Sequence, residues 1–294
     1  MTMSNFAMAS VLVLLSSGAS AAGGKSGVEM LGCAGLPCAQ FHAGSASLKL
    51  LIDTGNAVSV LDMASARAMK LQVGPYKQAN GEVVPGYQGA VLKNLTLGEQ
   101  VIGDVQVLVV DMKDEIAKGT FPKADGSLSY RAIKEQVLTL DFRDHRLSLS
   151  AGEPDRLDRC GTLSYPTFGP KGPPIVVSSG FEVNGVALSM QVDTLYSGTM
   201  LIFPSAVDKT GLAGQSHGAK IRNFPFTDGG VDMIEAEVSH ESFMGHSLRA
   251  PAPVYFATDK VHTPAGMFDG TVGAELFKDR KVTFDFKNNR LWVG

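Results

Sequence analysis

The chain has 294 residues, a formal net charge of −3 and an apolar fraction of 44%, and 19% of its residues are charged. This length exceeds that of a usual single domain and can bury a substantial core. The near-neutral charge gives no electrostatic reason to expect nucleic acid or an anionic membrane as a partner. The 33 glycines indicate many tight turns and favour an all-β fold.

The first segment has the pattern of an export signal. Residues 6–16 form an apolar run, and the small residues after it end in Ala19-Ser20-Ala21, a cleavage pattern of the A-x-A kind. The run is too short to span a bilayer, and no later stretch is long and apolar enough to do so. We therefore expect residues 1–22 to be a signal peptide and the chain to be exported, periplasmic or secreted. A buried helix is the alternative, since no Lys or Arg precedes the run.

Export would permit disulfides, and the chain has three cysteines. Cys33 and Cys38 are close enough in sequence for a local bridge, which would leave Cys160 free. The alternative is a longer-range bridge from Cys160 to one of the other two. The loop supplies too few Cys and His residues for a metal site, and the six histidines form no H-E-x-x-H motif. We expect no cofactor and no metal.

The second half of the chain repeats the first. Residues 125–150, DGSLSYRAIKEQVLTLDFRDHRLSLS, align without a gap with residues 269–294, DGTVGAELFKDRKVTFDFKNNRLWVG. Each copy predicts a short helix followed by two strands joined by a polar turn. Upstream, LKLLIDTGNAVSVLDMASA (48–66) pairs with LSMQVDTLYSGTMLIFPSA (188–206). In both of these copies an apolar strand ends at Asp-Thr, and a turn, a second strand and a short helix follow.

These repeats predict two lobes of similar build. The N-terminal lobe covers residues 23–150 and the C-terminal lobe residues 175–294. Residues 151–174 between them are rich in Gly and Pro and are expected to be a linker. Asn80-Gly81 in one lobe and Asp228-Gly229 in the other mark hairpins at roughly equivalent places.

The repeat places an aspartate at the same point of each half. Asp53-Thr54-Gly55 follows the apolar pair Leu51-Ile52, and Asp193-Thr194 follows Gln191-Val192; Val272-Gly273 then precedes a helix in the second half. This order of motifs resembles that of retropepsin-like and pepsin-like aspartic proteases. From about Val28 to Gly294, the sequence looks like a bacterial exported member with two fused lobes. The resemblance implies two β-barrel lobes with short helices and a cleft between them.

The resemblance also implies the chemistry. Two neighbouring carboxylates cannot both ionise, so Asp53 and Asp193 would share one proton. One would activate a water and the other would donate to the scissile carbonyl. Thr54 and Thr194 would hydrogen-bond across the interface, and Gly55 would let the loops approach each other.

Three further expectations follow from the resemblance. The Asn80-Gly81 hairpin would form a flap that includes Gly81, with Tyr87 or Tyr76 as its aromatic residue. The substrate would be a peptide or unfolded protein. A monomer would suffice for a complete site, because one chain supplies both aspartates.

The sequence departs from the family pattern at two glycines. Leu195 stands where a glycine follows the second Asp-Thr, and Ser129 replaces the glycine that corresponds to Gly273. A leucine cannot adopt glycine-only torsions without strain. The leading interpretation is an aspartic endopeptidase. The alternatives are an inactive protein of the same fold that binds peptides or a protein partner, and an unrelated β-barrel that binds a small apolar ligand.

Overall fold

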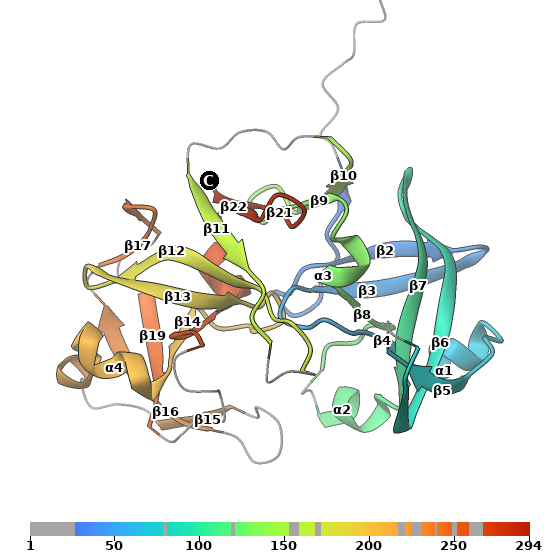
Figure 1. Ribbon diagram of the computed structural model, residues 1–294, viewed down its shortest axis with the longest axis horizontal. Helices are drawn as coiled ribbons and strands as arrows, with labels where there is room; N and C mark the ends of the chain where they lie inside the picture. Colours follow the sequence, from blue (N-terminus) through green and yellow to red (C-terminus); the bar gives the residue numbers. More distant parts are fainter. Residues whose placement is uncertain are drawn as a thin grey trace, which may run out of the picture.

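The computed structural model describes residues 27–78, 81–118, 121–152, 159–167, 172–216, 221–224, 231–238, 240–248, 252–258 and 267–294. The expected signal peptide, residues 1–22, lies outside these ranges. Within them, no helix is both long enough and apolar enough to cross a membrane. Strands dominate and the helices are short (Figure 1). The prediction of an all-β fold is therefore confirmed.

The first half forms a closed six-stranded barrel. The strands pair in the order β2-β3-β8-β4-β7-β6, and β6 pairs back to β2. β5 extends the sheet beyond β6. The elements of this half are β2 (Cys38–Ala43), β3 (Ala46–Asp53), β4 (Ser59–Asp62), α1 (Met63–Ala68), β5 (Gly74–Lys77), β6 (Val83–Leu97), β7 (Gln100–Val110), α2 (Lys113–Lys118) and β8 (Gly126–Ser129).

The second half repeats the pairings at the centre of this barrel. β13 pairs with β20 and β14 with β19 in parallel, as β3 does with β8 and β4 with β7. The elements of this half are β12 (Val177–Val183), β13 (Val186–Val192), β14 (Met200–Ile202), α4 (Pro204–Thr210), η1 (Leu212–Gln215), β15 (Ile221–Phe224), β16 (Val231–Val238), β17 (Glu241–Phe243), β18 (His246–Ser247), β19 (Ala252–Ala257), β20 (Gly270–Val272) and η2 (Ala274–Phe277). The Asp228-Gly229 turn expected between β15 and β16 lies outside the described residues.

A third group of strands connects the halves. It consists of β1 (Val28–Glu29), β9 (Val137–Asp141), β10 (Arg146–Ser150), β11 (Cys160–Ser164), β21 (Lys281–Asp285) and β22 (Arg290–Val293), and α3 (Tyr130–Ile133) leads into it. β9 and β21, which occupy equivalent places in the repeat, pair antiparallel. The hydroxyls of Thr139 and Thr283 lie 3.1 Å apart at the centre of this pairing. An approximate two-fold axis therefore passes between equivalent residues.

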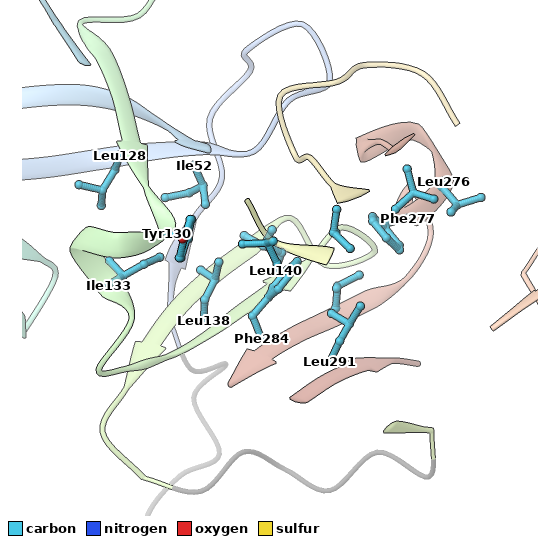
Figure 2. Packing of buried hydrophobic residues seen from close by; sticks show 14 of the residues in the cluster. Ile52, Leu128, Tyr130, Ile133, Leu138, Leu140, Leu276, Phe277, Phe284 and Leu291 are labelled. Carbon is cyan, nitrogen blue, oxygen red and sulfur yellow. The ribbon is translucent and has the colours of Figure 1, made fainter. Parts of the chain in front are cut away.

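Buried side chains join both halves to these strands. Leu138 and Leu140 lie two residues apart on β9, so they point to the same side of the sheet, where they are buried. Figure 2 shows them between Ile52 and Leu128 of the first half and Leu276 and Phe277 of the second. The core is thus continuous across the molecule.

The segment expected to be a linker, residues 151–174, differs from the expectation. It contains β11, which pairs with β22 on one side and β12 on the other. Its Gly-rich and Pro-rich composition predicted turns, whereas Cys-Gly-Thr-Leu-Ser at residues 160–164 fills the position between the last strand of the chain and the second half.

The repeated Asp-Gly pairs have a structural explanation. A Cβ at Gly126 would collide with the carbonyl oxygen of Val60, and a Cβ at Gly270 with that of Leu201. Neither glycine has a positive φ, so space rather than backbone torsion requires glycine here. The close approach allows β8 to lie between β3 and β4, and β20 between β13 and β14.

The aspartates of these pairs bind equivalent strands, β3 in the first half and β13 in the second. The Asp125 carboxylate accepts the backbone N–H of Lys49 at 2.8 Å and the hydroxyl of Ser65 at 2.6 Å. The Asp269 carboxylate accepts the backbone N–H of Ser189 at 2.9 Å. The repeated Asp-Gly is therefore a part of the scaffold.

We predict that Gly126→Ala destabilises the protein by about 1–3 kcal/mol or more, because the added methyl group overpacks the β4–β8 contact. Gly74→Ala is the matched control, since nothing lies within 4 Å of a Cβ at that strand position. Urea unfolding followed by the fluorescence of Trp292, which is 4% exposed, measures both. Equal stability of the two variants would contradict the steric explanation.

Candidate active site

The two Asp-Thr motifs meet through their threonines. The Thr54 hydroxyl donates to the Val192 carbonyl at 2.7 Å and accepts the Thr194 N–H at 3.1 Å. The Thr194 hydroxyl donates to the Ile52 carbonyl at 2.5 Å and accepts the Thr54 N–H at 3.1 Å. Both threonines are fully buried. Each loop is therefore fixed by the other half of the chain, in the arrangement expected from the resemblance. We call these four hydrogen bonds of Thr54 and Thr194 the threonine crossing.

Asp53 is the last residue of β3 and is only 6% exposed. Its carboxyl group accepts the backbone N–H groups of Gly55 and Asn56 and the hydroxyl of Ser127. Ser127 lies on β8, which pairs in parallel with β3. The strand pairing thus supplies a side-chain donor to the first aspartate.

Asp193 directly follows β13 and is partly buried. Its Oδ1 accepts the backbone N–H of Leu195 at 2.9 Å and that of Tyr196 at 3.3 Å. Its own N–H donates to the carbonyl of Val272 at 3.0 Å. The turn after the second motif is therefore folded around this carboxylate.

Gly55 brings the first loop against the second aspartate. A Cβ at Gly55 would collide with the carboxyl group of Asp193. In addition, the Gln191 side-chain amide donates to the Gly55 carbonyl at 3.2 Å. The structure therefore places the motif residues Asp53, Thr54, Gly55, Asp193 and Thr194 together.

The two carboxyl groups interact electrostatically. Burial first, and the negative charge of Asp193 second, raise the pKa of Asp53 well above its ordinary value. Burial also raises the pKa of Asp193, although the N–H groups of Leu195 and Tyr196 oppose this change. Because burial and the nearby Asp193 charge both disfavour its ionised form, the Asp53 carboxyl group retains its proton at a pH where exposed carboxyl groups have lost theirs.

The two departures from the family pattern fit locally. Leu195 does not adopt a positive φ, so the glycine-only torsions that we expected to strain it are not required. The Ser129 hydroxyl lies 3.1 Å from that of Ser59, which in turn accepts the Ser129 N–H at 3.0 Å. At the equivalent Gly273, a Cβ would collide with the carbonyl oxygen of Tyr196. The first half therefore accommodates a serine whose polar groups bind Ser59, whereas the second half has room only for glycine.

The expected flap is a hairpin of β5 and β6. Gly81 has φ +83° and donates its N–H to the Gln78 carbonyl at 2.8 Å. Tyr87 is 54% exposed on β6, and Tyr76 on β5 is half-buried, with its ring beside Gly89. Asn80 lies outside the described residues. The closing of this hairpin over the aspartates stays a prediction.

The sequence analysis missed two contributors to the site, Ser127 and Gln191. Ser127 could have been found because the repeat aligns it with Thr271, another hydroxyl. Gln191 could have been found because it interrupts the apolar residues of β13. Within the described ranges, no three His, Cys, Asp or Glu side chains converge as a metal site would require.

The hydrogen bonds of Thr54 and Thr194 thus bring the two Asp-Thr motifs together at the junction of the β-rich halves. Residues 39–130 match the family model described as aspartyl protease. This match supports the resemblance to retropepsin-like aspartyl proteases over that segment of the chain. The match includes Asp53, Thr54 and Gly55, whereas Asp193 lies beyond it. No curated protein matches the chain.

We predict that Thr54→Val lowers the free energy of unfolding by about 1–3 kcal/mol, because it leaves the Thr194 N–H and the Val192 carbonyl buried without their partner. Thr54→Ser, which keeps the hydroxyl, should retain most of the stability. Urea denaturation of both variants is the measurement. If the Val variant were as stable as the Ser variant, the Thr54 hydroxyl would contribute no stability through the threonine crossing.

We predict that Asp53→Asn stabilises the protein at neutral pH and that the gain shrinks as the pH falls. A carboxyl group with a raised folded pKa stabilises the fold while protonated and loses that contribution as the pH rises through the folded pKa. Melting temperatures between pH 4 and pH 8 test this. Asp104→Asn is the control, because the Lys93 ammonium lowers the pKa of this exposed carboxyl and its pH dependence has the opposite sign.

Proposed function

We propose that the chain is an aspartic endopeptidase in which Asp53 and Asp193 together activate one water molecule. The aspartyl protease domain supports a protease-type function. The threonine crossing carries the finer proposal, because it holds the two aspartate loops against each other from opposite halves of the chain. The raised pKa of both carboxyl groups supports a pair that shares one proton.

The proposed reaction needs only the two carboxyl groups and water. The ionised carboxylate accepts a proton from the water, whose oxygen attacks the scissile carbonyl carbon. The protonated partner donates its proton to the carbonyl oxygen, which gives a neutral tetrahedral diol. The carboxyl group that took the proton of the water then donates it to the amide nitrogen, and the other carboxylate accepts a proton from the diol. The C–N bond breaks and leaves an amine and a carboxylic acid. No covalent bond to the protein forms at any stage.

The structure suggests how the carboxyl groups are kept in position. Backbone N–H groups of Gly55 and Asn56 hold Asp53, while those of Leu195 and Tyr196 hold Asp193. Such fixed donors require no reorganisation during the reaction. Because one chain supplies all of these groups, we propose that a monomer is sufficient. The substrate class is peptide or unfolded protein.

We also propose that the protein works outside the cytoplasm. Cys33 and Cys38 form a disulfide, and Cys160 is free and exposed, which agrees with the first of the two alternatives drawn from the sequence. Disulfides persist mainly in oxidising compartments. This bond and the apolar segment at residues 6–16 together support export to the periplasm or the medium.

The proposal predicts cleavage of fluorogenic peptides that is lost in both Asp53→Asn and Asp193→Asn. The expected fall in kcat/KM is roughly 10²–10⁴-fold, the usual contribution of a general acid or base. Asp104→Asn, an exposed carboxyl change, should retain wild-type activity. Cleavage that survives both substitutions would exclude the pair as the catalytic groups.

The pH profile of kcat/KM is expected to be bell-shaped, with its basic limb above the ordinary carboxyl range, because both folded pKa values are raised.

Binding of a statine-containing peptide distinguishes an active enzyme from an inactive binding protein of the same fold. An inert chain that binds substrate peptides but shows no preference for the statine analogue would favour the alternative function.

A further inference from the structure

A small apolar cluster of the first half lies beside the second aspartate loop. Its buried members are Cys33, Cys38 and Leu51, and partly buried side chains pack against them: Leu31, Leu36, Phe121, Ala124 and Leu195. We call this group the disulfide cluster. Among its described members, Leu195 alone comes from the second half of the chain. The side chain of Leu195 therefore packs against the opposite half of the chain.

The disulfide cluster is bonded to the strand that carries the first aspartate. Cys38 pairs with Leu51 across β2 and β3. Between the two cysteines, the Pro37 carbonyl accepts the N–H of Ile52 at 2.9 Å. The Ile52 carbonyl then accepts the hydroxyl of Thr194. A continuous set of contacts thus runs from the disulfide loop to the second motif.

Leu195 connects the same cluster to the second aspartate. Its backbone N–H donates to Asp193 Oδ1 at 2.9 Å, while its side chain packs on the disulfide cluster. A glycine at this position could make the hydrogen bond but not the apolar contact. The residue that departs from the family pattern therefore adds an apolar contact with the other half to the hydrogen bonds that Thr194 makes with it.

The two motifs are not interchangeable in this respect. At Gly55 a side chain is excluded, because a Cβ would meet the Asp193 carboxyl group. At Leu195 the backbone has no positive φ and the side chain has an apolar site to fill. The first loop can thus approach Asp193 closely, while Leu195 restrains the second loop by packing.

We propose that Leu195 and the Cys33–Cys38 disulfide form one positioning unit that fixes the Asp193 carboxylate relative to Asp53. The unit takes the place of the glycine that the family pattern has after the second Asp-Thr. The proposal rests on the proposed peptidase function for its kinetic consequences. It makes Leu195 and the disulfide loop positioning residues, which act through Asp193 rather than on the substrate.

The decisive variant is Leu195→Gly, since the two views of this residue predict opposite results. If Leu195 only impairs a glycine position, the variant gains activity. If Leu195 positions Asp193, kcat falls by about ten- to a hundredfold, because displacement of a catalytic group by about 1 Å has an effect of this order. KM should change little, and the basic limb of the pH profile should shift. Leu195→Met, which restores an apolar side chain, should recover most of the activity.

The disulfide arm uses Cys33→Ala/Cys38→Ala, with Cys160→Ala as the matched cysteine control. The double variant should resemble Leu195→Gly in kcat and pH profile, whereas the control should match wild type. Adding Leu195→Gly to the double variant should cause little further loss, since both changes release one unit. Leu36→Ala, which keeps the disulfide but trims the cluster, provides a milder change should the double variant not fold.

A readout independent of activity separates failure of this proposal from failure of the proposed function. The pH dependence of the melting-temperature difference between parent and Asp193→Asn reports the environment of that carboxyl group. The pH range over which this melting-temperature difference changes should shift when Leu195→Gly is the parent, even if the wild type cleaves no peptide. An unchanged pH dependence, an unchanged or raised kcat, or fully additive effects of Leu195 and disulfide changes would overturn the positioning unit.

Discussion

The threonine crossing, the set of hydrogen bonds that Thr54 and Thr194 exchange between the two halves, is the constraint on which the rest of the site depends. Each hydroxyl donates to a carbonyl and accepts an N–H from the opposite half. Ile52, Thr54, Val192 and Thr194 are all buried, so a polar group among them that lost its partner would stay unsatisfied in the interior. The crossing therefore holds Asp53 and Asp193 near each other despite their mutual repulsion. Burial raises the pKa of both carboxyl groups, and for Asp53 the nearby charge of Asp193 raises it further.

The repeat in the sequence predicted much of the local structure. Each copy forms the expected strand, turn, strand and short helix around its Asp-Thr, and the expected helix with two following strands near its end. These features depend on local periodicity and turn residues, which a sequence records directly. The local Cys33–Cys38 bridge was also among the predictions, because its two cysteines lie in one short loop.

Contacts between distant segments were not predictable in this way. The pairing of β9 with β21 and the insertion of β11 beside β22 depend on how the halves meet. Gly55 was expected to let the two loops approach each other, but the group that lies against it could not be predicted from the sequence. Its backbone has no positive φ, and the Asp193 carboxyl group explains the glycine. Such a steric reason appears only once both loops are placed.

The pairing of β9 with β21 also bears on the order in which the chain can fold. β9 belongs to the first half, yet its partner is among the last strands to be synthesised. Until β21 arrives, β9 has an open edge that can pair with another chain, and long-range pairing of this kind is slow. A nascent chain would therefore hold the barrel of the first half beside an unfinished sheet. Chaperones that shield strand edges would be most useful to it in that interval.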